Sequence, residues 1–193
     1  MASRTPPSVI HKLAKCQKIL GYEFRDISLL EQSLTLKRNR RLATAGDTYL
    51  QVALVDRWFS LASSTPYDFN VIRAEAVSNS TLSALGFRRG LHLCTLPHEC
   101  TTFRQMADTV EAIVGAVYRD ALFENGKRNP VEWDEFEGVV ARLGINHPLI
   151  ATSADIRWSL TPIRTSRKLL PQFFSKGNHL ELTKMLAMAS GKS

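Results

Sequence analysis

The segment 106–118 restricts the fold of this chain more than any other. It is apolar at almost every position, and Asp108 and Glu111 are its ionisable side chains apart from the terminal tyrosine. A helix that is apolar on nearly all sides has to be buried by neighbouring elements. Because Asp108 and Glu111 are three positions apart, they project from one face of that helix. The segment therefore predicts a buried helix that carries two carboxylates.

Helical patterns also dominate the rest of the chain. Apolar residues recur at three- and four-residue steps, and capping residues or prolines mark the ends of the segments. The predicted helices span residues 8–20, 27–36, 40–62, 71–79, 80–90, 103–124, 130–143 and 179–189. Strand patterns are few, so the predicted fold class is all-α. We predict one helical domain at 8–144 and a basic C-terminal extension at 145–193.

A third acid, Asp47, lies on the helix predicted over 40–62. Apolar and small residues recur at helical spacing around it, so Asp47 projects from an otherwise apolar surface. Three carboxylates on two buried helices are costly unless a positive charge lies between them. Mg²⁺ prefers oxygen ligands and usually keeps several waters. Asp47, Asp108 and Glu111 are therefore the candidate ligands of Mg²⁺, or of Mn²⁺, and the catalytic role of the same three residues is what the family resemblance described next implies.

Four ordered motifs resemble the endonuclease domain of the ribonuclease III family. Residues 39–47 are similar to the family's signature N-E-R-L-E-F-L-G-D, and residues 107–118 are similar to its A-D-x-x-E-A-L-I-G-A-x-Y motif. Residues 20–35 resemble its opening L-G-Y-x-F and L-L-x-x-A-L-T patterns, and residues 72–82 resemble its L-R-A-x-L-V-S-N-x-T-L helix. Each motif alone would be weak, but their order along the chain makes the resemblance specific.

The resemblance implies an enzyme that hydrolyses double-stranded RNA through metal held by Asp47, Asp108 and Glu111. The family's signature, however, has a metal-binding glutamate where this chain has Ala43, and another glutamate where it has Arg40. Water can fill an octahedral position around Mg²⁺, so the sequence is still compatible with metal-dependent catalysis although one ligand is missing. The Mini-III branch and small ribonuclease III-like proteins of filamentous fungi also resemble this chain in placing alanine before the G-D pair.

The resemblance also implies a homodimer, because the signature helix contributes to the subunit interface in the family. Leu42, Ala43, Ala45 and Tyr49 offer an apolar, small-residue surface that suits close packing between subunits. The alternative is that this face belongs to the core of a monomer.

The charge of the chain predicts a polyanionic partner. Its 25 Lys and Arg against 18 Asp and Glu leave a net charge of +7, with a pI near 9.6. Seven basic against two acidic residues lie in the extension at 145–193, which does not resemble a double-stranded-RNA-binding domain. Double-stranded RNA is held mainly through its shape and backbone. The candidate RNA-binding residues are Lys37, Arg38, Arg40, Arg41, Arg164, Arg167 and Lys168.

Two other functions are compatible with the sequence. The loss of the glutamate at Ala43 and the basic extension favour a catalytically silent RNA-binding or ribonucleoprotein component, whereas the three acids favour an enzyme. A regulatory subunit that pairs with an active nuclease is a third reading.

The cysteines and the N-terminal residues bear on the compartment. Three cysteines without C-x-x-C spacing indicate a reducing compartment, and no apolar run approaches the length of a membrane span. We expect a cytoplasmic protein. Mitochondrial import is the alternative, because residues 1–22 contain four basic residues and no acid.

His92, Cys94, His98 and Cys100 match no standard zinc spacing, so we interpret that segment as a structural loop.

Overall fold

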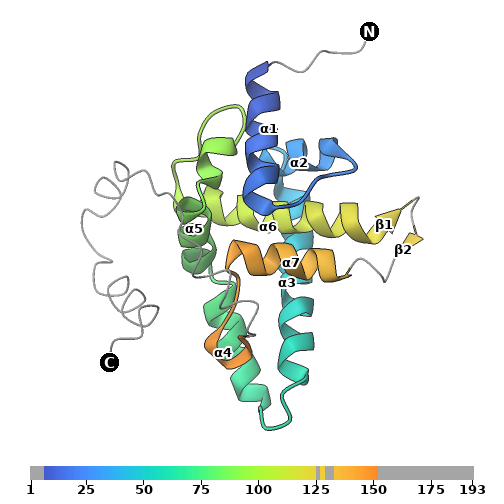
Figure 1. Ribbon diagram of the computed structural model, residues 1–193. Helices are drawn as coiled ribbons and strands as arrows, with labels where there is room; N and C mark the ends of the chain where they lie inside the picture. Colours follow the sequence, from blue (N-terminus) through green and yellow to red (C-terminus); the bar gives the residue numbers. More distant parts are fainter. Residues whose placement is uncertain (1–6, 125–126, 129–132, 152–193) are drawn as a thin grey trace, which may run out of the picture. The chain divides into compact units, whose positions relative to one another are not determined.

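The computed structural model describes residues 7–124, 127–128 and 133–151 (Figure 1). The described residues all belong to one compact unit. The described α-helices are α1 (Pro7–Leu20), α2 (Ile27–Leu34), α3 (Arg40–Phe59), α4 (Pro66–Ala76), α5 (Asn79–Arg88), α6 (Phe103–Leu122) and α7 (Trp133–Leu143). The predicted all-α fold class is confirmed.

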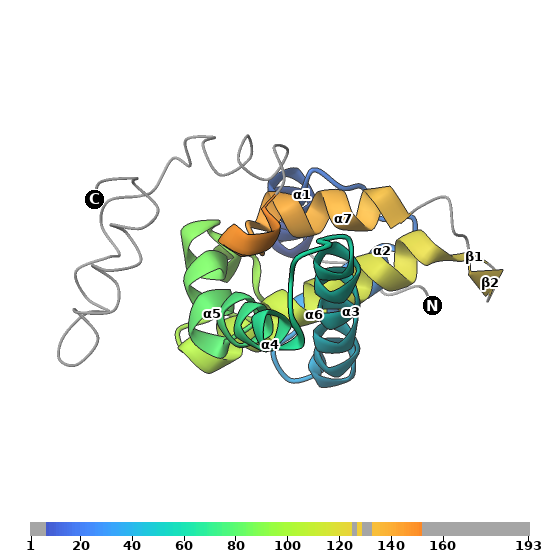
Figure 2. The same ribbon diagram turned by 90° about the horizontal axis from the view of Figure 1, so that it is seen from below.

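Helix α6 forms the centre of the domain, as its all-round apolar sequence predicts. Figures 1 and 2 show α6 crossing the domain, with α3, α5 and α7 packed around it. The side chains of α6 with no exposed surface include Met106, Ala107, Val110, Ala112, Ile113, Val114, Ala116 and Val117. At about 1.5–3 kcal/mol for each fully buried large apolar side chain, α6 is a main source of the domain's stability.

Helix α4 begins earlier than the sequence analysis predicted. The predicted start near Val71 is wrong, because the helix begins at Pro66, one of the prolines that were expected to mark the end of a segment. Pro66 occupies the first turn, where its missing N–H costs no hydrogen bond. The Thr65 side chain accepts a hydrogen bond from the Asp68 backbone N–H, and the Asp68 carboxylate accepts one from the Thr65 backbone N–H. This capping box, Thr-Pro-Tyr-Asp, was readable in the sequence.

A short hairpin follows α6 and was not predicted. The helix predicted to reach residue 124 ends at Leu122, because Phe123 pairs with Arg128 in the antiparallel strands β1 (Phe123–Glu124) and β2 (Lys127–Arg128). The predicted start of the next helix at Pro130 and the predicted helix at 179–189 lie outside the described residues.

Residues beyond α7 pack against α3 and α4. Ile150, in the short 3-10 helix η3 (Pro148–Ile150), is buried in a small apolar cluster with Leu54 and Ile72. The His147 side chain accepts a hydrogen bond from the Leu149 backbone N–H, and its Nε2 lies 3.0 Å from Glu75 Oε2. These contacts attach the segment after α7 to the domain.

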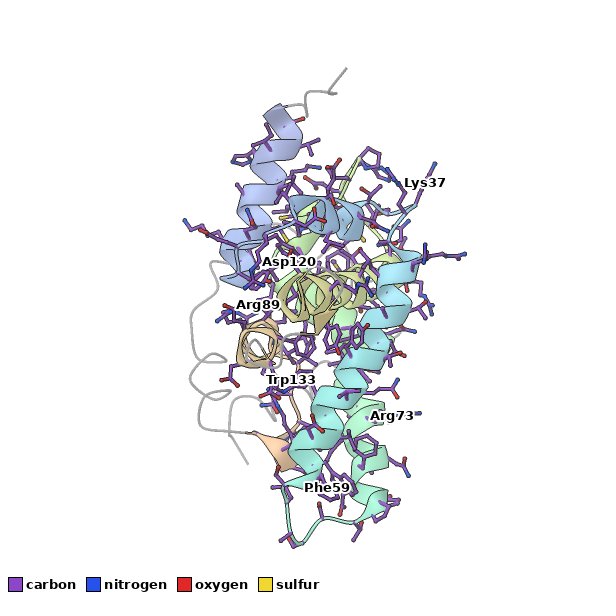
Figure 3. All side chains as sticks on the ribbon, turned by 90° about the vertical axis from the view of Figure 1, so that its right-hand side faces the viewer. Lys37, Phe59, Arg73, Arg89, Asp120 and Trp133 are labelled. Atoms are coloured by element: carbon purple, nitrogen blue, oxygen red, sulfur yellow. The ribbon has the colours of Figure 1, made fainter. Side chains whose placement is uncertain are left out.

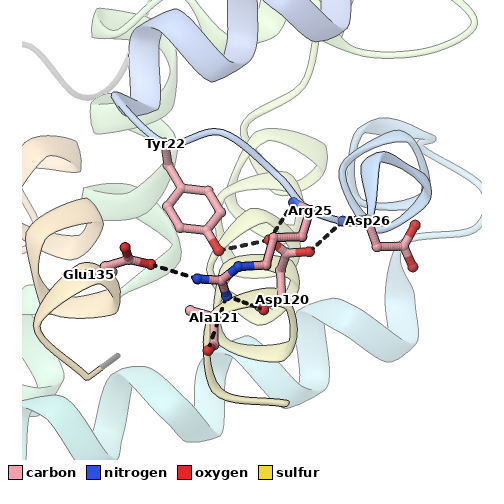
Figure 4. Close-up of polar contacts among 6 residues, drawn as sticks. All are labelled: Tyr22, Arg25, Asp26, Asp120, Ala121 and Glu135. Atoms are coloured by element: carbon pink, nitrogen blue, oxygen red, sulfur yellow. Dashed lines mark hydrogen bonds and ion pairs between the residues drawn. The ribbon is translucent and has the colours of Figure 1, made fainter. Parts of the chain in front are cut away.

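Asp120, near the end of α6, holds the loop between α1 and α2 (Figure 4). Its buried carboxylate accepts hydrogen bonds from Tyr22 Oη at 2.7 Å and from the backbone N–H groups of Arg25 and Asp26 at 3.0 and 2.8 Å. The Arg25 guanidinium donates to carbonyl oxygens in the last turn of α6 and lies 3.6 Å from Glu135 of α7. One carboxylate therefore joins α6 to the loop that leads into α2.

The cysteine- and histidine-containing segment before α6 does not gather its four potential ligands. Cys94, in the 3-10 helix η1 (Leu91–Cys94), is buried and shares a side-chain hydrogen bond with Cys16 of α1. Cys100 donates to the Thr102 carbonyl oxygen at 3.4 Å, and His98 is exposed.

In the part of the chain that is described, no helix is long and apolar enough to cross a membrane.

The face of α3 that we predicted for subunit packing is used inside the chain. Leu42 and Ala43 are buried in the main core, and Tyr49 packs against it. The Tyr49 ring stacks on the Tyr118 ring of α6, with centroids 3.4 Å apart and 14° between the planes. Leu42, Ala43 and Tyr49 are therefore used inside the chain, which corrects their assignment to a dimer interface, and Ala45 is half-buried.

Candidate active site

Helices α3 and α6 cross in direct backbone contact at two glycines. A Cβ atom on Gly46 would overlap the carbonyl oxygen of Glu111, and one on Gly115 would overlap the carbonyl oxygen of Leu42. Since no side chain separates the helices here, residues beside the crossing come unusually close. Asp47 follows Gly46 in α3, so the crossing brings its carboxylate toward that of Glu111.

The three acids that the sequence singled out influence one another in the structure. Burial, followed by the negative charges of Asp47 and Asp108, raises the pKa of Glu111 from 4.5 to about 7. The charge of Arg104 acts in the opposite direction. Asp47 of α3 and Asp108 of α6 therefore both act electrostatically on Glu111.

Two of these carboxylates are held by other side chains. Gln51 Nε2 donates to Asp47 Oδ2 at 3.0 Å, and Arg73 Nη1 of α4 donates to Gln51 Oε1 at 3.4 Å. Arg104 Nε lies 3.0 Å from Asp108 Oδ1. In this arrangement no three His, Cys, Asp or Glu side chains of the described residues stand ready to hold a metal ion together.

Gln51, Arg73 and Arg104 were not among the predicted site residues. Two of them carried a readable signal, because Gln51 follows Asp47 by four positions and Arg104 precedes Asp108 by four, the spacing at which helical side chains meet. Arg73 had no such signal, since only the packing of α4 beside α3 places it near Gln51 (Figure 3).

The chemistry of the three acids fits a hard divalent cation. Carboxylate oxygens are the ligands that Mg²⁺ and Mn²⁺ prefer, and their mutual repulsion would be relieved by a positive charge. Ala43, one turn before Asp47, is 5% exposed and supplies no oxygen. The residues that would hold such an ion are therefore the predicted ones, Asp47, Asp108 and Glu111, after their side chains rearrange from the positions described above.

The four basic residues before and at the start of α3 are exposed, which suits contact with an anion. No acid lies in the first turn of α3, and the Asn39 side chain makes no capping hydrogen bond. At a rise of 1.5 Å per residue, Asp47 lies about 10 Å along the axis from Arg40. Figure 3 shows Lys37 beside this end of α3. The exposed residues are Lys37, Arg38, Arg40 and Arg41; Arg164, Arg167 and Lys168 lie outside the described residues.

Comparisons with known proteins agree with this geometry. Residues 40–121 match the family model of the ribonuclease III domain. Ribonuclease 3 of Shewanella amazonensis is 37% identical over 139 residues, which cover 65% of this chain and 62% of the relative. Ribonuclease 3 of Shewanella frigidimarina is 35% identical over 150 residues, which cover 71% and 66%. The nuclease domain of ribonuclease III from Campylobacter jejuni superimposes with a TM-score of 0.56 at 24% identity, covering 69% of this chain and 94% of that domain.

The helical fold is that of a ribonuclease III nuclease domain. The chain belongs to the ribonuclease III family. The alignments with these two Shewanella relatives span 62% and 66% of the relatives' own lengths.

The raised pKa of Glu111 predicts how pH changes the stability of the metal-free protein. Because the folded-state pKa of about 7 exceeds the ordinary value of 4.5, the protonated form favours folding, and this contribution is lost as pH rises from 4.5 through 7. After a discount for the exposed part of the side chain, we expect about 1–2 kcal/mol. Thermal unfolding in EDTA should show the decline in the wild type. The Glu111→Gln variant should lack this decline. If the stability of the variant and of the wild type depends on pH in the same way, the raised pKa does not belong to Glu111.

Proposed function

We propose that this protein is a metal-dependent endoribonuclease that hydrolyses double-stranded RNA. The observation that carries the proposal is the convergence of Asp47, Asp108 and Glu111 at the crossing of α3 and α6 within a ribonuclease III domain. Members of that family generally depend on divalent metal, and three carboxylates with mutual repulsion suit such an ion.

The protein's own residues would prepare the site in three ways. On binding an ion, Asp47 would give up its hydrogen bond with Gln51, and Asp108 would give up its ion pair with Arg104. Glu111 would lose the proton that burial and its neighbours favour. A divalent ion held by Asp47, Asp108 and Glu111 would supply Lewis acidity for the activation of water and for the stabilisation of charge on the scissile phosphate.

The exposed cations at the start of α3 support an RNA backbone contact next to the acids. Phosphate would relieve the unfavourable placement of Arg40 and Arg41 at the positive end of the helix. Double-stranded RNA hides its base edges in a deep, narrow groove, so recognition by shape and phosphate predicts low sequence selectivity. We assign the same role to Lys37 and Arg38, and to the basic residues of the extension, Arg164, Arg167 and Lys168.

A cleavage assay tests the proposed activity. Labelled double-stranded RNA should be cut in the presence of Mg²⁺ or Mn²⁺ and left intact in EDTA, with Mn²⁺ at least as effective because it binds oxygen and nitrogen ligands more tightly. Asp47→Asn and Glu111→Gln should each lower the rate by about 100-fold or more, a barrier increase of about 2.7 kcal/mol. Asp56→Asn, an exposed acid of the same helix α3, is the matched control and should cut normally. If both the Asp47→Asn and the Glu111→Gln variants cut RNA at the wild-type rate, these residues do not form the active site.

The same assay separates the activity from the main alternative. A catalytically silent RNA-binding component would retain double-stranded RNA in the presence of metal without cutting it. The loss of the family glutamate at Ala43 favours that alternative, whereas the raised pKa of Glu111 favours a site shaped for an ion. A regulatory subunit would show activity only after an active nuclease is added.

We also propose a homodimer. The Campylobacter jejuni nuclease domain has a region involved in dimer formation. In this chain Thr44, Thr48 and Val52 form an exposed row on α3, one turn apart, on the side away from the buried face. We assign the subunit contact to this row.

Sedimentation equilibrium at micromolar concentration measures the oligomeric state. The chain of 21.6 kDa should sediment with twice that mass, and Val52→Lys should shift the protein toward the monomer. Ile10→Lys replaces an apolar residue of α1 that is more exposed than Val52 and should leave the dimer unchanged. A wild-type monomer would exclude a mechanism with one active centre in each of two paired subunits.

A further inference from the structure

Arg104 lies at the rim of the acid site, one helical turn before Asp108 on α6. The distance between Arg104 Nε and Asp108 Oδ1 is 3.0 Å, and the two side chains are 72% and 25% exposed. The charge of Arg104 also acts on Glu111, whose pKa it lowers against the larger effects of burial and of the two neighbouring acids. The guanidinium therefore influences two of the three carboxylates from the solvent side.

Each carboxylate of the site is stabilised differently in the absence of metal. Asp47 accepts a neutral hydrogen bond from Gln51, while Glu111 favours its protonated form. Asp108 instead faces Arg104, which brings a full positive charge into direct contact with a carboxylate of the site. Of these three arrangements, the ion pair is the one that most resembles binding of a cation.

We propose that Arg104 is a built-in counter-ion of this site: it pairs with Asp108 in the metal-free protein and gives Asp108 up when a divalent cation binds, so its charge limits the affinity for metal. This inference rests on the proposed function, because the cation concerned is the one that the nuclease would use. Arg104 is in this sense a positioning residue, not a catalytic one.

Two electrostatic effects give Arg104 this role. It competes with the metal for Asp108, and a guanidinium that stays nearby repels a second cation. The pair is exposed to solvent, and such pairs contribute little to stability, so a doubly charged ion can displace the arginine. Because Ala43 leaves three acids at the site, one positive charge cancels a large share of its negative charge. Arg104 should therefore matter more here than it would beside four acids.

Calorimetric titration of the full-length, RNA-free protein with Mn²⁺ measures the competition directly. We expect Arg104→Gln to bind Mn²⁺ about 3- to 10-fold more tightly than the wild type, the effect of removing one nearby charge. Arg104→Lys keeps the charge and should stay close to the wild type. Lys18→Gln removes an exposed charge from α1 and controls for the change in net charge. Unchanged or weaker Mn²⁺ binding by Arg104→Gln would overturn the inference.

Thermal unfolding gives a second readout that a purely structural role would not produce. In EDTA, Arg104→Gln should melt below the wild type, because the three acids lose their counter-ion. In excess Mn²⁺ the order should reverse, since tighter ligand binding stabilises the folded state more. A variant that melts below the wild type under both conditions shows that Arg104 supports only the helix.

The outcomes also separate this inference from the proposed activity. Tighter Mn²⁺ binding by Arg104→Gln, together with a wild type that does not cut RNA, supports the counter-ion role and removes the nuclease proposal. If the wild type cuts RNA but the wild type and Arg104→Gln bind Mn²⁺ with the same affinity, the nuclease proposal is supported and the counter-ion role is wrong. If neither protein binds Mn²⁺, the counter-ion role is wrong, because removal of Arg104 did not open the site.

Discussion

Replacing Gly46 by alanine should destabilise the protein by about 4 kcal/mol or more, a large part of the stability of a typical domain. The added methyl group would overlap the backbone carbonyl of Glu111, which no change of side-chain rotamer can relieve, so α3 and α6 would have to separate. Alanine gains about 1 kcal/mol of helix propensity over glycine, which is too little to compensate. Thermal or urea unfolding measures the loss, and Gly115→Ala should behave in the same way because it meets the Leu42 carbonyl.

Gly138→Ala is the matched control for this steric effect. Gly138 also lies within a helix, α7, but a Cβ atom there would be 3.5 Å from the flexible Arg142 side chain, an ordinary contact. The same substitution should therefore raise the stability by about 0.5–1 kcal/mol through helix propensity. Equal effects of Gly46→Ala and Gly138→Ala would show that the two helices do not touch at Gly46.

Asp120→Ala should cost about 3 kcal/mol or more, because it leaves a phenol and two backbone N–H groups without their acceptor. Asp120→Asn keeps the shape but replaces an acceptor oxygen by a donor, so we expect a smaller loss of about 2 kcal/mol. Urea unfolding of both variants measures these changes.

Two comparisons show whether the loss comes from these hydrogen bonds. Asp56→Ala removes an exposed acid of α3 and should change the stability by less than about 0.5 kcal/mol. Tyr22→Phe removes one donor and should cost about 1 kcal/mol in the wild type, yet much less in the Asp120→Ala background. Additive losses would mean that Tyr22 and Asp120 do not interact.

The positions of the helices follow largely from local sequence signals. Asp26 caps α2 through the Ser28 backbone N–H, and the helix predicted from 27 begins there. The start of α4 at Pro66 was missed because the proline was interpreted as a break, although the capping box beside it was visible. Local errors of this kind concern signals that were present and misinterpreted.

The site depended on more than local signals. Asp47 and Glu111 are 64 positions apart, and the sequence indicated their proximity only through the resemblance to a family. The contact of Arg73 with Gln51 joins two consecutive helices, and the contact of Asp120 with the loop at 22–26 joins elements far apart in the chain; both depend on how the elements pack. The predicted subunit face of Leu42 and Tyr49 failed for the same reason, because an apolar helical face suits a neighbouring helix of the same chain as well as a second subunit.

The sequence by itself determined that α6 is a buried helix with Asp108 and Glu111 on one face, because helical periodicity and all-round apolarity are local properties. It also determined that a glycine precedes Asp47. Only the tertiary structure decided that Gly46 meets the backbone of α6, which brings the acids together and raises the pKa of Glu111. Burial and like-charge repulsion depend on distances between elements, and those distances exist only once the helices have packed.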